Sequence, residues 1–222
     1  RHRINLSDIE IMPGYVDTEK FKPIQDKVSV RKKLGLPEDK KIILTVRRLV
    51  PRMGLDNLIR AMNIIIKKVP NAYLVIVGEG FLMESLKKMV SDSGLNEFIT
   101  FVGSVDEDSL ALFYQAADLF VLPTKELEGF GMIIIEALSC GLCILATPVG
   151  AIPEVLGNFN RDLLFRGTEP EDIAELTIRY LEDNNLRESI ASSGRDYVIK
   201  NYSLEVIRSI FLDNLEQNRV QY

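Results

Sequence analysis

The chain has 222 residues, of which 46% are hydrophobic and 27% are charged, and its formal net charge at pH 7 is −5. This composition is ordinary for a globular protein, and the length suits one large domain with a substantial core. The acidic balance argues against the basic face that nucleic-acid binding requires, so we expect no nucleic-acid partner. The longest apolar runs are too short to predict a membrane-spanning helix.

The predicted elements begin at residues 9–12, Ile-Glu-Ile-Met, which we interpret as a short strand. Beyond residue 41, short β-rich runs alternate with helical patterns. Most of these runs are continuously apolar, which is typical of strands covered on both faces. The predicted strands are residues 42–46, 73–77, 99–102, 119–122, 143–146 and 163–165, and the helices between them are residues 55–69, 81–93, 107–116, 132–139 and 152–156.

Repeated strand–helix–strand units predict an α/β fold with a doubly wound, Rossmann-like parallel sheet. Gly35 and Gly94 follow helical runs and are expected to cap them, whereas Asp106 and Ser109 are helix start signals. Three further helical patterns follow the sheet, and Ser203 can cap the last of them. They cover residues 170–183, 186–201 and 204–217.

Two cysteines, Cys140 and Cys143, lie in an apolar stretch of a chain that has a single histidine. Zinc sites need more soft ligands at characteristic spacings. We therefore expect reduced thiols in the core and no metal site.

Arginines cluster in the loop after the first long strand, where residues 47–54 read Arg-Arg-Leu-Val-Pro-Arg-Met-Gly. Guanidinium groups pair with phosphates in a bidentate manner, so this loop favours an anionic ligand. A solvated basic loop is the alternative. The next loop, Gly-Glu-Gly at residues 78–80, is a weak phosphate signal that tight-turn chemistry explains equally well. Residues 103–105 end the third strand, where free backbone groups can contact a base.

The most informative stretch is residues 128–136, Glu-Gly-Phe-Gly-Met-Ile-Ile-Ile-Glu, which follows the strand at 119–122. Gly129 and Gly131 allow a ligand to approach the backbone, and the amides that open the following helix favour negative charge. Carboxylates bind ribose hydroxyls in dinucleotide sites, which makes Glu136 a candidate for that role. The alternatives are that Glu128 and Glu136 simply reach water.

A further Pro/Gly-rich loop, residues 147–154, follows the next strand. It can bring Gly150 near a phosphate, or it is only a connector.

Together these loops resemble the C-terminal, donor-binding domain of retaining glycosyltransferases of family 4, which have the two-domain GT-B fold. The resemblance covers nearly the whole chain. Any one motif is weak, but the full set in the family's order is specific. The motifs are residues 12–21 (Met-Pro-Gly-Tyr-Val-Asp-Thr-Glu-Lys-Phe), 48–54, 77–80, 117–123, 128–136 and 149–154.

The resemblance implies a donor site for a nucleotide sugar, with a UDP- or GDP-hexose as the expected donor. No metal is implied, because arginines and helix dipoles neutralise the developing diphosphate charge. Glu128 and Arg48 are the implied catalytic residues, Arg48 on the diphosphate and Glu128 facing the sugar. The implied donor-binding set is Arg48, Arg52, Gly103, Ser104, Val105, Glu128, Gly129, Phe130, Gly131, Met132 and Glu136.

Two departures from the family pattern leave an alternative open. Met53 stands where the family usually has lysine, and the entry motif reads Pro-Gly-Tyr-Val-Asp at residues 13–17 in place of Pro-Asn-Gly-Val-Asp. A degenerate, non-catalytic binding or scaffold subunit is therefore the alternative to a transferase. Another GT-B enzyme, such as a sugar-nucleotide epimerase, is a third hypothesis, but such chemistry uses acid–base residues that the chain offers sparsely.

The resemblance also implies a domain plan. Residues 1–25 are expected to be an interdomain entry segment with the first strand, residues 26–202 the nucleotide-sugar-binding domain, and residues 203–222 a helix that packs toward a missing N-terminal domain. That domain would bind a glycan or lipid-linked acceptor, so this chain is expected to be a fragment that is inactive alone. The implied location is cytoplasmic, with peripheral attachment to the inner membrane surface in many family members.

Overall fold

The computed structural model describes residues 12–219. The strand expected at residues 9–12 lies outside this part except for Met12, which is exposed and belongs to no strand.

Five parallel strands form one sheet in the order β3-β2-β1-β4-β5. Ile43 in the central strand pairs with Leu74 on one side and Leu119 on the other. The chain moves outward from β1 in one direction and then returns to β4, so the strand order reverses between β1 and β4. In open α/β sheets, this switch point forms a crevice beyond the carboxyl ends of the strands. The strands are β1 (Lys41–Val46), β2 (Ala72–Val77), β3 (Ile99–Gly103), β4 (Leu119–Leu122) and β5 (Ile144–Ala146).

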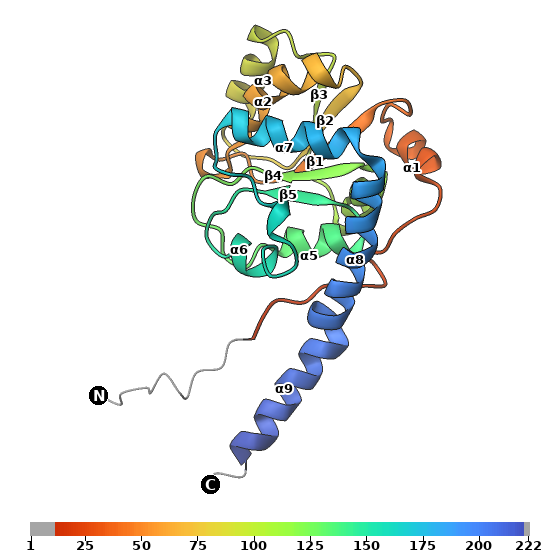
Figure 1. Ribbon diagram of the computed structural model, residues 1–222, viewed down its shortest axis with the longest axis vertical. Coiled ribbons are helices and arrows are strands. Elements are labelled where there is room, and N and C mark those ends of the chain that lie inside the picture. Colours follow the sequence, from red (N-terminus) through yellow and green to blue (C-terminus); the bar gives the residue numbers. More distant parts are fainter. Residues whose placement is uncertain (1–11, 220–222) are drawn as a thin grey trace, which may run out of the picture.

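Helices cover both faces of the sheet (Figure 1). Helices α2, α3 and α7 lie on one side and α5 and α6 on the other, while α1 packs on α4 and α8 on α5. The helices are α1 (Lys27–Leu34), η2 (Pro51–Met53), α2 (Leu55–Lys68), α3 (Met83–Asp92), α4 (Glu107–Ala116), α5 (Met132–Ser139), α6 (Ile152–Val155), η3 (Arg161–Leu163), α7 (Pro170–Glu182), α8 (Asn184–Tyr202) and α9 (Leu204–Arg219).

The predicted doubly wound α/β fold is confirmed, and the cap residues behave as expected. Gly35 and Gly94 adopt left-handed φ angles of 65° and 68° after α1 and α3. Asp106 accepts a hydrogen bond from the Ser109 amide at the start of α4, and the Ser203 hydroxyl accepts one from the Val206 amide at the start of α9.

One predicted strand, residues 163–165, is wrong. Its first residue, Leu163, ends the 3-10 helix η3, and Leu164 forms only an isolated bridge with Ala146. Leu163 and Phe165 are both buried. The apolar run therefore reflects burial in the core and not membership of the sheet, a distinction that periodicity cannot make for so short a run.

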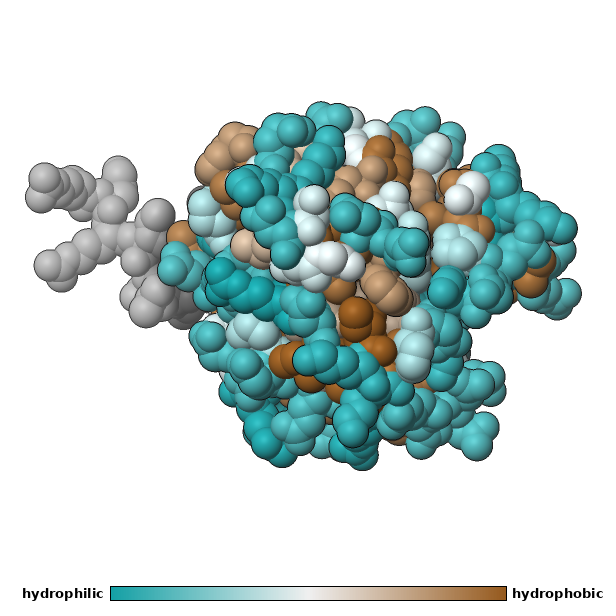
Figure 2. All heavy atoms as spheres, turned by 90° about the horizontal axis from the view of Figure 1, so that it is seen from above, coloured by the Kyte–Doolittle hydropathy of each residue, from teal (hydrophilic) through white to brown (hydrophobic). Residues whose placement is uncertain are grey.

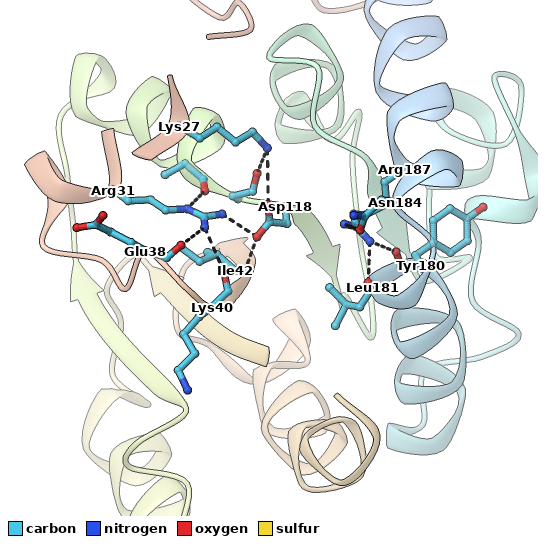
Figure 3. Close-up of polar contacts among 12 residues, drawn as sticks. Lys27, Arg31, Glu38, Lys40, Ile42, Asp118, Tyr180, Leu181, Asn184 and Arg187 are labelled. Carbon is cyan, nitrogen blue, oxygen red and sulfur yellow. Dashed lines mark hydrogen bonds and ion pairs between the residues drawn. The ribbon is translucent and has the colours of Figure 1, made fainter. Parts of the chain in front are cut away.

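A buried arginine ties α1 to the amino-terminal end of the sheet (Figure 3). Arg31 donates to the backbone carbonyls of Ala116, Glu38 and Lys40, and it forms an ion pair with Asp118 at 2.7 Å. The same Asp118 carboxylate accepts from the amide of Ile42, the second residue of β1. Because every donor of a buried guanidinium must be satisfied, this network fixes the position of α1 against the sheet.

The entry segment and the last helix meet at a short parallel bridge between Val16 and Ser203. Beyond this point α9 extends away from the body of the domain (Figure 1). Phe211, Leu212 and Leu215 are each between 45% and 48% exposed along it.

Both cysteines are buried and unpaired, as expected for core thiols. Burial raises the pKa of Cys143 to about 12, so this thiol is neutral and unreactive.

Viewed from above, hydrophilic residues surround smaller hydrophobic areas (Figure 2). No helix in the described range is both long and apolar enough to cross a membrane.

Candidate functional site

A cavity of about 580 Å³ lies at the switch point, beyond the carboxyl ends of the central strands. Its charged residues are three arginines and two glutamates, which leave one net positive charge. The lining residues are Val46, Arg47, Arg48, Arg52, Met53, Val77, Gly78, Glu79, Ser104, Val105, Leu110, Glu128 and Ile133.

Arg47 and Glu128 form an ion pair in this cavity, with side chains that are 8% and 12% exposed. The same guanidinium nitrogen, Nη2, also donates to the hydroxyl of Thr124. Burial lowers the pKa of Arg47, and the hydrogen bond and charge of Glu128 oppose that shift. The pair therefore keeps a cation and an anion in place where solvent is largely excluded.

The backbone of Arg47 is held by the loop that follows β2. The Arg47 amide donates to the Val77 carbonyl at 2.9 Å, and the Leu49 amide donates to Glu79 at 2.8 Å. Gly78 has a φ of 130°, and any side chain at this position would overlap the Arg47 carbonyl. The Gly-Glu-Gly turn thus acts by close backbone packing, which is the tight-turn interpretation of its sequence.

The other cationic residues of the loop differ in their surroundings. Arg48 is exposed at the rim, and its guanidinium group has no polar partner within residues 12–219. Arg52 is half-buried and donates to the Leu127 carbonyl at 2.6 Å. Met53 is only 4% exposed and gives the cavity an apolar wall. The loop therefore offers two arginines near solvent and one that is buried.

The end of β3 contributes the opposite side of the cavity. Ser104 and Val105 line it, whereas Gly103 does not. Gly103 has a φ of 86° and accepts a hydrogen bond from the Gly78 amide at 2.8 Å. Its role in the structure is to join the ends of β2 and β3.

The loop that contains Glu128 is held by the loop that follows β5. The Glu128 carbonyl accepts from the Ala151 amide at 3.2 Å. Gly150 has a φ of 58°, and a side chain there would overlap the Glu128 backbone. Gly150 therefore positions Glu128, an arrangement in which close approach to another loop requires glycine.

The glycine-rich turn before α5 lies at the edge of the cavity. Gly131, with a φ of 77°, precedes the first helical residue, and Phe130 packs edge-on against Tyr202 with ring centroids 5.6 Å apart. Gly129 has open space around its α-carbon. None of these three residues is among those that line the cavity described above.

Glu136 lies in a neighbouring cavity of about 500 Å³, apart from the arginines. Met132 and Glu136 line this second cavity, whereas Ile133 lines the first. The Tyr114 hydroxyl donates to Glu136 at 2.7 Å. Burial raises the pKa of Glu136, and the Tyr114 hydrogen bond opposes the shift. The lining residues are Tyr15, Val16, Asp17, Lys20, Phe21, Glu107, Met132, Glu136 and Leu204.

Of the residues that sequence reasoning selected, the structure brings Arg48, Arg52, Ser104, Val105 and Glu128 together in one cavity. It adds Arg47, which was not in the selected set. The sequence offered one signal that Arg47 belongs to the site, namely its position directly after a buried strand. Its burial and its pairing with Glu128 depend on a contact between distant parts of the chain.

The arrangement is suited to an anionic ligand. Guanidinium groups pair with phosphate oxygens, and the partial enclosure strengthens such pairs relative to water. Within residues 12–219, no group of three or more His, Cys, Asp or Glu side chains is placed to hold a metal ion.

The chain matches known proteins over most of its length. The profile of the family described as "Glycosyl transferases group 1" matches residues 26–197. A GDP-mannose-dependent monoacylated alpha-(1-6)-phosphatidylinositol monomannoside mannosyltransferase of Corynebacterium glutamicum is 32% identical over 206 residues. That match covers 89% of this chain and 53% of the mannosyltransferase, so the chain spans about half the length of this relative.

Two solved structures share the fold. The C-terminal domain of a glycosyl transferase group 1 family protein from Francisella tularensis is 27% identical with a TM-score of 0.76, and the match covers 85% of this chain and 99% of that domain. Sucrose-phosphate synthase from Thermosynechococcus elongatus is 26% identical with a TM-score of 0.82, over 96% of this chain and 53% of the synthase.

Proposed function

The chain belongs to the glycosyl transferases group 1 family, and from that premise we propose that it is the donor-binding half of a retaining glycosyltransferase of GT-B fold. It binds a nucleotide sugar whose hexose passes to a glycan or lipid-linked acceptor. The observation that carries this proposal is the cavity at the switch point, where three arginines and Glu128 converge.

The proposed donor contacts combine residues that line the cavity with groups that the family resemblance implies. Arg48 and Arg52 bind the diphosphate, and they stabilise the charge that develops on it as the bond to the sugar breaks. Glu128 faces the sugar. Such stabilisation by fixed guanidinium groups requires no metal ion. Base and ribose contacts come from residues 103–105 and Glu136, and the backbone amides of residues 130–132 border the sugar and phosphates.

We propose GDP-mannose as the donor. The support is the corynebacterial relative, which is named for its dependence on GDP-mannose and is 32% identical to this chain. That relative is also named for a phosphatidylinositol-based acceptor, which favours a lipid-linked acceptor for this chain. Membership of a transferase family favours transfer over epimerisation.

The complete site includes an N-terminal acceptor-binding domain. Because transfer needs an acceptor held against the donor sugar, this chain alone binds donor and turns over little of it. The exposed apolar residues of α9, Phe211, Leu212 and Leu215, are the surface that this domain would cover. Rapid sugar transfer by the isolated chain would contradict this part of the proposal.

The proposal is tested by calorimetric titration of the purified chain with GDP, UDP and ADP. We expect GDP to bind most tightly. An Arg48→Gln variant should bind GDP about tenfold more weakly, since it loses one charge-assisted contact. Arg60→Gln is the matched control, because Arg60 is exposed on α2 and does not line the cavity. Binding of no nucleotide would contradict the proposal.

A non-catalytic binding subunit is the second candidate, favoured by two features of the same cavity. Arg47 and Glu128 already neutralise each other, and Met53 presents an apolar wall. Nucleotide binding by the chain, together with absence of transfer after the acceptor domain is added, would identify this alternative.

A further inference from the structure

We propose that Arg47 bridges the donor and Glu128: its Nη2 holds the carboxylate while its Nε donates to an anionic phosphate oxygen of the nucleotide. This inference rests on the proposed function and adds a donor contact to it. It also makes Arg47 the residue that links the diphosphate to the acid facing the sugar.

The first support is an unsatisfied donor. The Nε atom of Arg47 is buried and has no hydrogen-bond partner among the described residues. By contrast, Nη2 of the same group contacts both Glu128 and Thr124. A buried charged donor left unpaired is costly, and native structures rarely keep one without a reason. A ligand oxygen in the cavity that Arg47 lines would satisfy it after a small side-chain movement that uncovers Nε.

The second support is the balance of charge around the group. Glu128 is the only carboxylate in ion-pair contact with Arg47 within the described range. Burial lowers the pKa of Arg47 more than the hydrogen bond and charge of Glu128 raise it. A phosphate would supply a second anion for the Nε donor, which Glu128 does not contact. The fork of a guanidinium can bind two anions at once in this way.

The third support is rigidity. Hydrogen bonds from Arg47 to the end of β2 and from Leu49 to the following loop fix the backbone on either side of Arg48. Gly78 and Gly80 pack directly against Arg47 and Leu49, with no room for side chains. A group held in this way loses little conformational entropy on binding, which is the condition for an effective preorganised contact.

Arg47 also differs from the other arginines in what it can do. Arg48 is exposed, and Arg52 already donates to the Leu127 carbonyl. Screening by solvent weakens contacts at the rim, whereas a buried guanidinium keeps most of its electrostatic strength. Among the three, Arg47 should therefore make the largest contribution to the selection of a charged diphosphate over a neutral ligand.

The experiment compares two ligands, GDP and guanosine, that differ only by the diphosphate group. GDP binding is measured by calorimetry and the weaker guanosine binding by ligand-observed NMR, for the wild type, Arg47→Gln, Arg47→Lys and the control Arg60→Gln. Thermal unfolding of each variant establishes that it is folded under the conditions used. Arg47→Lys retains a charge for Glu128 but has no equivalent of the Nε donor.

We expect Arg47→Gln to weaken GDP binding about tenfold to a hundredfold and to leave guanosine binding unchanged. Arg47→Lys should fall between this variant and the wild type. Unchanged GDP binding in both Arg47 variants would overturn the inference and leave the proposed function intact. An equal loss of GDP and guanosine binding would also overturn it, because that result indicates a structural role. A wild-type chain that binds neither ligand would overturn the proposed function as well.

Discussion

Arg47 and Glu128 form an ion pair across the switch point of the sheet, although 81 positions separate them in the chain. Arg47 follows β1 and Glu128 follows β4, and these two strands are neighbours in the sheet. With side chains only 8% and 12% exposed, the pair joins the two loops that frame the cavity. Its charges are already arranged before any ligand arrives.

Removal of one partner should destabilise the domain. Glu128→Gln leaves the Arg47 charge buried without a counter-ion, a change that typically costs about 3 kcal/mol or more. Urea unfolding measures the loss, and Glu126→Gln serves as the control because Glu126 is exposed two residues away. Equal stabilities of the two variants would show that the pair contributes nothing to folding.

The fold could be predicted from the sequence because it depends on local patterns. Continuous apolar runs identified β1 to β5, and Gly35 and Gly94 marked helix ends through their freedom to adopt positive φ. The strand predicted at Leu163 to Phe165 was wrong for a physical reason. Buried residues are apolar whether their backbone pairs with a strand or forms a turn, so the apolar run could not distinguish the two.

The site was only partly predictable because its key contacts are long-range. The motif at residues 128–136 pointed to Glu128, which lines the cavity, but it did not indicate which arginine Glu128 would meet. Glu136 was expected in the same site, yet its hydrogen bond to Tyr114 places it in the neighbouring cavity. One turn of α5 separates residues that line different cavities, and this depends on how α4 and α5 pack.

Gly150 should be a positioning residue for Glu128, and Gly35 provides a matched comparison. Both have left-handed φ angles, 58° and 65°, but a β-carbon at Gly35 meets nothing within 4 Å, whereas one at Gly150 overlaps the Glu128 backbone. Gly35→Ala should therefore cost about 1 kcal/mol from backbone strain alone. Gly150→Ala should cost more and should also weaken GDP binding.

Unfolding curves and calorimetric titrations of the two glycine variants separate these effects. If Gly150→Ala retained full nucleotide affinity, the loop at residues 147–154 would be a connector and not a support for the site.

Met53→Lys should lower the stability of the unliganded chain and increase the stabilisation that bound GDP provides. Met53 is 4% exposed, so a lysine there would be desolvated near three arginines, and the unliganded chain should lose stability. A bound diphosphate would compensate that charge. We therefore expect GDP to raise the melting temperature of the variant more than that of the wild type.

Thermal unfolding across a series of GDP concentrations provides this comparison. A variant whose melting temperature rises less than that of the wild type would show that a lysine at this position makes no favourable contact with the diphosphate.

The pH dependence of stability should reveal the energetic cost of burying the Glu136 carboxylate. Burial raises its pKa above the ordinary value of 4.5. As pH rises through 4.5, the unfolded chain releases this proton while the folded chain still retains it, so the unfolded state binds fewer protons and stability falls. The decline ends once pH exceeds the raised folded pKa, and below 4.5 the penalty is absent.

Glu136→Gln removes the titrating group and keeps an oxygen that can accept the Tyr114 hydroxyl. The variant should therefore gain stability relative to the wild type as pH rises from 4 to 8, while its nucleotide binding weakens if the carboxylate holds the ribose. Urea unfolding at several pH values gives the difference, with Glu97→Gln as the control because Glu97 is exposed. A constant difference in unfolding free energy between variant and wild type over this range would mean that burial of the Glu136 carboxylate costs no stability. A gain in stability coupled to a loss of binding would indicate that this carboxylate is kept for its ligand at the expense of the fold.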